Sequence, residues 1–208
     1  MKLISKKLFI AIITFAFFSY FFIDKKLALY FEQTSQITHD IFKFLTTFGY
    51  SEYFLVPSGL IFLYFYFRKI NSPIKEAAKY IFVSVASSGI IVIIIKIITA
   101  RYRPIMFLEQ NLYGFNFFEI GYKVNSFPSG HAATIMGGFS ALAFLFPKYK
   151  WPLLIFGVVA SFSRVVLEKH YLSDVLIGAL IGYLVSAWLY KKSLGQRAKS
   201  KEPHQKSS

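Results

Sequence analysis

The chain has 208 residues, of which 55% are hydrophobic, 20% aromatic and only 16% charged. A soluble domain carries about 25% charged residues, so this composition excludes an ordinary soluble fold. Disorder is excluded for most of the chain, because so much apolar surface must be buried. The chain has no cysteine, which excludes disulfides, a thiolate nucleophile and cysteine-bound metal.

The net charge is +14, and the basic residues lie between apolar runs rather than on one soluble face. We therefore expect the basic residues to bind the anionic headgroups of a lipid bilayer, and we expect no binding of nucleic acid.

Six apolar segments predict an all-α integral membrane protein, a bundle of six transmembrane helices. They are Leu8–Ile23, Tyr53–Phe67, Tyr80–Ile98, Ala132–Phe146, Trp151–Leu167 and Tyr171–Tyr190. The third and sixth segments reach the roughly 20 residues that a bilayer requires, and the shorter ones need flanking residues. We interpret the first as a retained helix rather than a signal peptide, because Asp24-Lys25-Lys26 follows it without a small-x-small cleavage site.

The distribution of lysine and arginine predicts the orientation of the bundle. Fifteen of these residues fall on the side that holds both termini and nine on the other, so both termini should face the cytoplasm. We divide the chain into residues 1–52, the first helix and an outward loop; 53–190, a core of five helices; and 191–208, a basic, disordered cytoplasmic tail. Small size and minimal loops suggest a bacterial inner membrane.

The first motif is Lys96-x6-Arg103-Pro104 on the outward side. A lysine near the end of a very apolar helix is costly and indicates function. Seven residues are about two helical turns, so Lys96 and Arg103 can share one face, and Pro104 marks the helix end. The plainer interpretation is a lysine that reaches the membrane surface and an arginine that stops transfer. The nearby Arg101 is interpreted as a loop charge.

The second motif is Pro128-Ser129-Gly130-His131, just before the fourth apolar segment. Ser129 is a favoured N-cap, and Gly130 allows the backbone to approach a ligand. The first turn of a helix presents N–H groups that suit a phosphate, with His131 beside them. A capped helix with an interfacial histidine is an equal alternative.

The third motif is Ser163-Arg164-x5-His170-x3-Asp174. His170 and Asp174 are four residues apart, so their side chains would meet on a helix. A carboxylate that holds one imidazole nitrogen leaves the other free to attack or to take a proton. The alternative is a loop whose ends are polar by chance.

Taken together, the three motifs resemble the type 2 phosphatidic acid phosphatase (PAP2) family of membrane lipid phosphatases, over roughly residues 53–190. The resemblance implies that His170 is a nucleophile forming a phosphohistidine, Asp174 orients it, and His131 is the general acid. It further implies that no metal or other cofactor is needed. The phosphate-binding residues it implies are Lys96, Arg103, Arg164, Ser129 and Gly130.

The expected function is therefore hydrolysis of a lipid phosphomonoester or pyrophosphate at the outer face of the membrane. The sequence does not distinguish undecaprenyl pyrophosphate, phosphatidylglycerol phosphate, phosphatidic acid and lipid A as substrates. It also leaves open a lipid-linked phosphotransferase that uses the same site or, less favoured, a non-enzymatic membrane protein. The oligomeric state and the role of the aromatic loop 114–119 are not indicated. The pair Gly178-x3-Gly182 predicts close helix packing within the chain.

Overall fold

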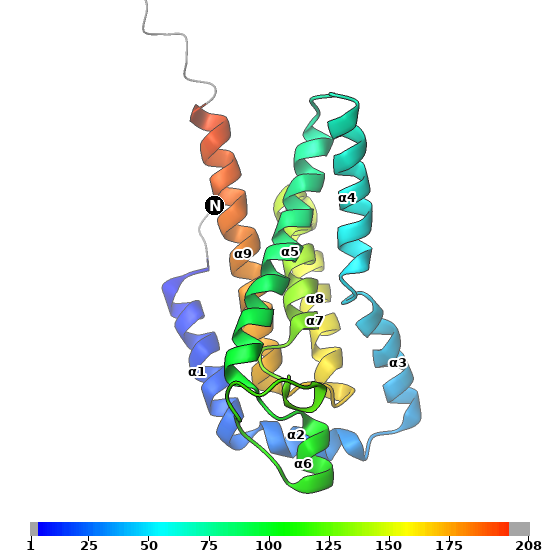
Figure 1. Cartoon of the computed structure of the whole chain (residues 1–208), viewed down its shortest axis with the longest axis vertical. Helices are drawn as coiled ribbons and strands as arrows, with labels where there is room; N and C mark the ends of the chain where they lie inside the picture. Colours follow the sequence, from blue (N-terminus) through cyan, green and yellow to red (C-terminus); the bar gives the residue numbers. More distant parts are fainter. Residues whose placement is uncertain (1–3, 200–208) are drawn as a thin grey trace, which may run out of the picture.

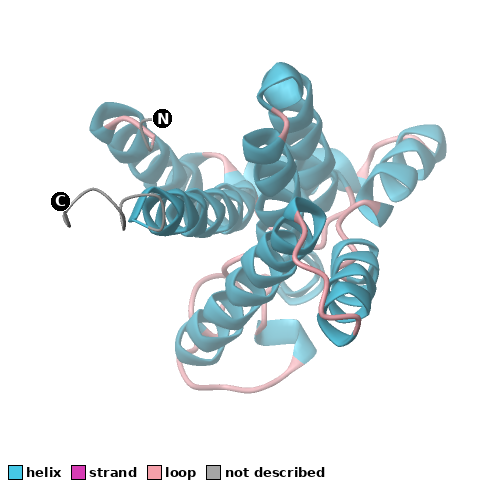
Figure 2. Cartoon of the chain, turned by 90° about the horizontal axis from the view of Figure 1, so that it is seen from above, coloured by secondary structure: helices cyan, strands magenta, loops and turns pink. Residues whose placement is uncertain are grey.

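The structure, a computed structural model, describes residues 4–199. Over this range the chain forms helices joined by loops and no strand, as Figure 2 shows. The helices are α1 (Lys6–Phe22), α2 (Asp24–Glu32), α3 (Gln36–Thr47), α4 (Glu52–Phe67), α5 (Pro73–Thr99), α6 (Pro104–Gln110), α7 (Gly130–Leu145), α8 (Lys150–Val166) and α9 (Leu172–Lys199). Two short 3-10 turns lie at Tyr122–Val124 and Pro147–Tyr149. The expected all-α fold is confirmed.

Each of the six apolar segments contains a helix, but not every helix is long enough to cross a bilayer. Three segments of the described chain meet the length and composition of a span: Pro73–Thr99, Pro147–Val166 and Leu172–Ser193. A fourth is counted if α1 and α2, which meet at an angle of 62°, form one bent span. The helices α4 and α7 have only 16 residues each. The number of six spans therefore stays a prediction.

The last helix extends beyond its apolar segment. The sequence predicts a disordered tail from residue 191, whereas α9 continues to Lys199, so that prediction is wrong for residues 191–199. Lysine and arginine are good helix formers, and the helix therefore continues beyond its apolar part. Residues 200–208 lie outside the described part of the chain.

Small side chains form the interior of the bundle, and large apolar side chains face outwards. The central helix α7 packs on α5, α8 and α9 (Figure 1), and its buried residues are mostly alanine, glycine, serine and threonine. On α5, by contrast, Ile90 and Ile93 are more than half exposed. This inversion is typical of membrane helices, where lipid solvates large apolar groups and small residues allow close backbone contact.

The contact between α7 and α9 depends on two glycines of α9. A Cβ atom at Gly178 would lie 2.3 Å from the carbonyl oxygen of Ser129, and one at Gly182 would lie 2.3 Å from that of Ala133. Close packing of this glycine pair within the chain is thus confirmed. The contact brings the first turn of α9 against the start of α7.

The first turns of α7 and α9 lie at the end of the bundle that carries α2 and α6, at the bottom of Figure 1. The helix α5 ends there at Thr99, and the next residue, Ala100, has a left-handed backbone (φ 42°). The chain then runs through α6 and residues 111–129 across this end before entering α7. All three motifs converge at this end of the bundle.

We expect Gly178→Ala to destabilise the protein by about 1–3 kcal/mol or more, because the methyl group must displace backbone of α7. Gly89→Ala on α5 is the matched control: its Cβ would meet nothing within 4 Å, and alanine favours the helix by up to about 1 kcal/mol. Thermal unfolding of both purified variants in detergent measures the difference. Equal transition temperatures would contradict this account of the α7–α9 contact.

Candidate active site

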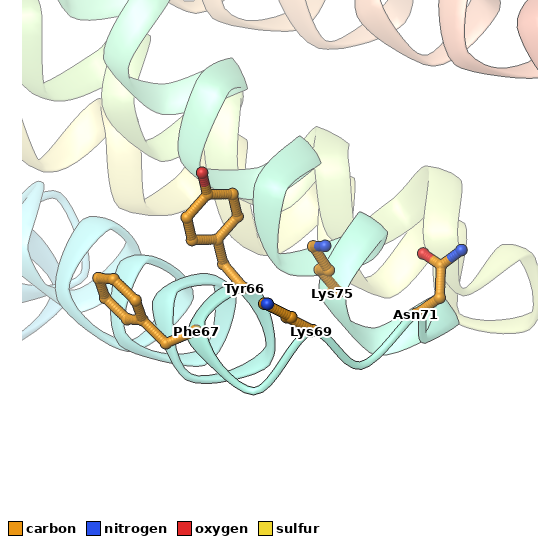
Figure 3. Close-up of a pocket in the computed structure, with 5 residues that line it drawn as sticks. All are labelled: Tyr66, Phe67, Lys69, Asn71 and Lys75. Atoms are coloured by element: carbon orange, nitrogen blue, oxygen red, sulfur yellow. The ribbon is translucent and has the colours of Figure 1, made fainter.

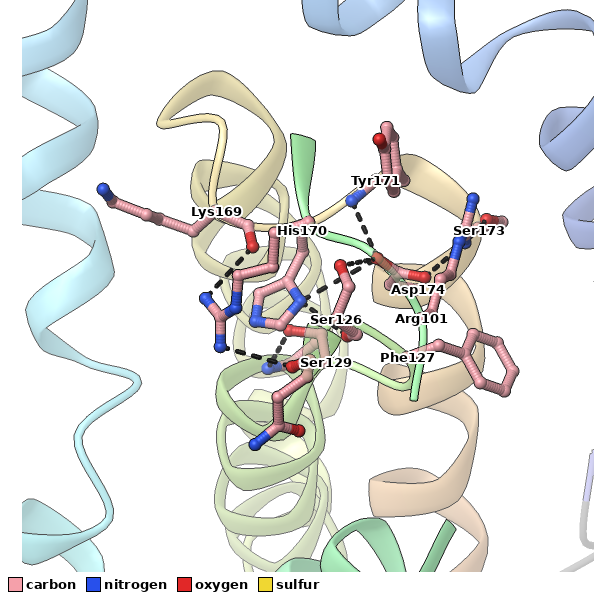
Figure 4. Close-up of polar contacts among 12 residues, drawn as sticks. Arg101, Ser126, Phe127, Ser129, Lys169, His170, Tyr171, Ser173 and Asp174 are labelled. Carbon is pink, nitrogen blue, oxygen red and sulfur yellow. Dashed lines mark hydrogen bonds and ion pairs between the residues drawn. The ribbon is translucent and has the colours of Figure 1, made fainter. Parts of the chain in front are cut away.

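His170 lies in the short link between α8 and α9, and only 3% of its surface is exposed. Its Nδ1 atom is 2.7 Å from the backbone carbonyl oxygen of Ser126 (Figure 4). A carbonyl oxygen can only accept a hydrogen bond, so Nδ1 carries the proton in the neutral ring. The lone pair is therefore on Nε2, which is the nitrogen able to act as a nucleophile or base.

Asp174 approaches His170 less directly than its spacing suggests. The helix α9 begins at Leu172, so His170 lies outside it and the expected helical pairing is not formed. The Oδ2 atom of Asp174 is 3.9 Å from His170 Nδ1, which is too long for a hydrogen bond. Ser126 connects the two residues instead, because its hydroxyl donates to Asp174 Oδ2 at 2.6 Å while its carbonyl oxygen accepts from His170.

Two further groups bind the fully buried carboxylate of Asp174. The backbone N–H of Tyr171 donates to Oδ2 at 2.9 Å, and the guanidinium of Arg101 pairs with Oδ1 (Figure 4). Ser126 lies outside the three motifs, and the sequence gives no local signal for its role. The interpretation of Arg101 as a loop charge is wrong, because this side chain is 0% exposed and is held by two buried aspartates.

Lys96 and Arg103 meet at one backbone oxygen. The Nζ of Lys96 donates to the carbonyl oxygen of Asn125 at 2.7 Å, and Arg103 donates to the same atom at 3.3 Å. Arg103 also donates to the carbonyl oxygen of Lys169 at 3.3 Å, next to His170. The two basic residues do not share a helix face as expected, because α5 ends at Thr99 and Arg103 is the extended residue before α6.

Arg164 is in the last turn of α8, where it donates to the hydroxyl of Thr46 on α3 at 2.9 Å. The positive charges of Arg164, Arg103 and Lys96 all act on His131 and disfavour the protonated form of its imidazole. In the described chain none of the three is paired with a carboxylate, since their partners are carbonyl and hydroxyl oxygens. The buried Nε atoms of both arginines have no hydrogen-bond partner there. This end of the bundle thus carries concentrated positive charge that suits an anion.

The start of α7 borders the same region. The Ser129 side chain caps α7 by accepting from the N–H of Ala132, and its backbone N–H donates to the carbonyl oxygen of Asp174. A Cβ atom on Gly130 would lie 3.9 Å from the Cε of Lys96, so the glycine faces that lysine. The buried Nε2 of His131 has no partner among the described residues. All eight expected site residues therefore lie at one end of the bundle.

Gly49 and Tyr50, in the link between α3 and α4, also shape the site and were missed. The ring of Tyr50 packs edge-on against His131, with centroids 5.4 Å apart. A Cβ atom on Gly49 would lie 2.8 Å from Cδ2 of His131. An apolar contact of this kind has no sequence pattern, although a glycine at a helix junction suggests a close approach.

Two cavities of the described chain differ in their position relative to these residues. A cavity of about 480 Å³ lies at the α4–α5 connection, lined by Tyr66, Phe67, Lys69, Asn71 and Lys75 (Figure 3). It is at the end of the bundle away from α2 and α6 (Figure 1), so it takes no part in the site. A second cavity of about 70 Å³ is lined by Lys96 and Asn125, together with Ile93, Ile97, Glu119, Ile120 and Gly121.

Taken together, the fold and the site define a helical membrane protein that presents two imidazoles and three basic side chains at one end of its bundle. A family model described as the PAP2 superfamily matches residues 77–197, which is more than half of the chain. The chain belongs to this superfamily.

Two curated relatives and one solved structure extend the comparison. The chain is 31% identical to a lipid A 1-phosphatase from Rhizobium johnstonii over 66% of its own length and 61% of the relative. It is 30% identical to an undecaprenyl-diphosphatase from Sulfolobus acidocaldarius over 69% of its own length and 65% of the relative. It thus spans less than two thirds of either. The crystal structure of LpxE from Aquifex aeolicus shares the fold, with a TM-score of 0.60, 24% identity, and coverage of 79% of this chain and 92% of that one.

We expect His170 to stay neutral across the physiological range. The pKa of its imidazole is lowered to about 3, mainly by burial; Asp174 raises it, and the charges of Lys96 and Arg103 act in the same direction as burial. The unfolded chain takes up this proton near pH 6.5, so stability should fall as the pH drops below that value. Nitrogen-15 NMR of histidine-labelled protein, assigned with His170→Ala, should show a protonated Nδ1 that does not titrate between about pH 5 and 8. A midpoint near pH 6.5 would contradict the assignment.

Proposed function

We propose that this chain is a metal-independent membrane phosphatase that hydrolyses a lipid phosphomonoester or pyrophosphate through a phosphohistidine. One observation carries the proposal. His170 keeps Nε2 free by donating Nδ1–H to a carbonyl oxygen, and it does so beside three basic side chains that no carboxylate neutralises in the described chain. A neutral nucleophile beside unneutralised positive charge is what attack on a phosphate dianion requires.

In the first step, the Nε2 lone pair of His170 forms a bond to phosphorus as the bond to the leaving oxygen breaks. The bound phosphate dianion offsets the three basic charges and favours the protonated form of His131, which donates its proton to that oxygen. The leaving group departs as a lipid alcohol or a lipid phosphate. Lys96, Arg103 and Arg164 bind the phosphoryl oxygens, where charge develops. Ser129 and the backbone N–H of Gly130 add donors from the first turn of α7.

In the second step, water attacks the phosphorus, the phosphorus–nitrogen bond breaks, and free phosphate leaves. His131, now neutral, takes the proton from that water. Asp174 and Ser126 favour both steps by holding the Nδ1–H of His170, because the ring gains positive charge while phosphorylated. The three basic residues do here what a bound metal ion does in other phosphoryl-transfer enzymes, so no metal or other cofactor takes part.

The cavity beside Lys96 supports a lipid substrate. It is bounded by Ile93 and Ile97, which are 58% and 49% exposed on the lipid-facing side of α5, and by Ile120, which is 85% exposed. A headgroup can therefore reach Lys96 from the membrane side while its chains remain on an apolar surface. The names of the relatives, a lipid A 1-phosphatase and an undecaprenyl-diphosphatase, agree with this class of substrate.

Phosphate release by the purified protein tests the proposal. The substrates are undecaprenyl pyrophosphate, phosphatidylglycerol phosphate, phosphatidic acid and lipid A, each with and without EDTA. We expect at least one to yield free phosphate, and EDTA to have no effect. His170→Ala should lower kcat by at least about 10³-fold, and His131→Ala by about 10²–10⁴-fold, since one removes the nucleophile and the other the acid.

His39→Ala is the matched control for these variants, because His39 lies on α3 and its ring contacts the carbonyl oxygen of Phe31. It should keep wild-type activity. Transfer of phosphate to a second lipid without free phosphate would indicate the phosphotransferase instead. Full activity of His170→Ala would exclude the phosphohistidine route.

We further propose that the site faces the exterior or periplasm and that both termini are cytoplasmic, as the lysine and arginine distribution predicts. A reporter fused after Ser208 should then behave as cytoplasmic, and one inserted at Asn111 as external. The opposite pattern would put the site at the cytoplasmic leaflet, where different lipid phosphates are presented.

A further inference from the structure

Asp24 is a buried acid on the first membrane segment, at the point where α1 bends into α2. It is 1% exposed and accepts a hydrogen bond from the hydroxyl of Ser19 at 2.7 Å. It lies outside residues 77–197, the region that the family model matches. An acid at the end of an apolar helix is costly unless a partner compensates it, so its contacts are informative.

The partner of Asp24 is Arg101, the same residue that binds Asp174. One terminal nitrogen of the guanidinium donates to Asp24 Oδ2 at 2.9 Å, and the other pairs with Asp174 Oδ1. The hydroxyl of Tyr113 accepts a further bond from Arg101 at 2.9 Å. The ring centroids of Tyr20 and Tyr171 lie 4.7 and 4.4 Å, respectively, from the guanidinium carbon of Arg101. Arg101 is therefore fixed in direction, because its planar fork spans two buried carboxylates between aromatic rings.

Asp24 also binds the first turn of α9 directly. The backbone N–H of Ser173 donates to Asp24 Oδ1 at 3.1 Å, and the Ser173 hydroxyl contacts both Asp24 and Arg101. The N–H groups of the first helical turn have no acceptor within their own helix. Asp24 thus caps α9 from a different segment, at the residue next to Asp174.

These contacts determine which oxygen of Asp174 faces the imidazole. Asp24 binds one terminal nitrogen of Arg101, and the other terminal nitrogen binds Oδ1 of Asp174. The other oxygen, Oδ2, is then left for Ser126, Tyr171 and the Nδ1 side of His170. Without the charge of Asp24, Arg101 would have Asp174 as its only acidic partner in the described chain, and the carboxylate would be free to turn towards it.

We propose that Asp24 is a positioning residue for the reaction, which acts through Arg101 and the first turn of α9 to orient Asp174 and the Ser126–His170 contact. The proposal rests on the phosphatase function proposed above. Among the described residues, Asp24 forms no hydrogen bond or ion pair with a phosphate-binding residue, so it should govern the chemical step rather than substrate binding.

The main test is Asp24→Asn, which keeps the shape of the side chain and removes its charge. The probes are those of the four lipids above that the wild-type protein hydrolyses. We expect kcat to fall by about 10–100-fold, since a misplacement of about 1 Å can cost 10²-fold. The KM should stay within about twofold. The matched control is Asp40→Asn, an exposed aspartate of α3 paired with Lys43, which should leave both constants unchanged.

A second variant covers the case in which Asp24→Asn does not fold, as judged by its elution and thermal unfolding in detergent. Ser173→Ala removes only the hydroxyl between Asp24 and Arg101 and leaves both charges and the backbone cap in place. It should lower kcat by about 3–10-fold at unchanged KM, because it removes the two hydrogen bonds that this hydroxyl makes with Asp24 and Arg101. Ser193→Ala, farther along α9, is its control.

The folded fraction of each preparation, judged by elution and thermal unfolding in detergent, is used to normalise kcat, so a loss of folded protein is separated from a loss of rate. If the wild-type protein releases no phosphate from any probe, the proposed function fails. If it does, and folded Asp24→Asn keeps kcat within twofold or changes only KM, the positioning role is overturned. Where Asp24→Asn does not fold, unchanged kcat in Ser173→Ala overturns it.

Discussion

The buried carboxylate of Asp174 is the group on which the other contacts of the site depend. A carboxylate with no exposed surface must be satisfied within the protein, since leaving it unpaired costs several kcal/mol. Its partners come from the link after α5, from the segment before α7 and from the residue before α9. Satisfying this one acid therefore brings three separate parts of the chain together, and Ser126 extends the same contact to His170.

The basic side chains of the site fall into two sets with different electrostatic roles. Arg101 lies between two buried acids and is neutralised by them. Lys96, Arg103 and Arg164 donate to carbonyl and hydroxyl oxygens, which position them but leave their charge uncompensated in the described chain. A phosphate dianion would compensate that second set. This difference in partners distinguishes Arg101 from Arg103, although only two residues separate them. Arg101 is neutralised by carboxylates, whereas the charge of Arg103 is left for an anion.

The sequence predicts the helices and the convergence of the eight motif residues, because apolar runs and short-range motifs carry that information. It does not predict how those residues are held. Ser126 is 48 residues from Asp174, and Asp24 is 149 residues from Ser173, so neither contact leaves a local pattern. The helical pairing expected for His170 and Asp174 fails because α9 begins two residues after His170. For the contacts of Asp24, the usable signal is the cost of an acid at the end of an apolar run.

The bend between α1 and α2 lies beside the charge network of the site. At Ile23 the chain turns by 62°, and the next residue, Asp24, faces Arg101 and the first turn of α9. Arg101 is the only guanidinium with which Asp24 pairs in the described chain. The bend is thus coupled to the ion pair, and the ion pair to the orientation of Asp174. Asp24, which lies outside residues 77–197, thus helps to neutralise Arg101, which lies within them.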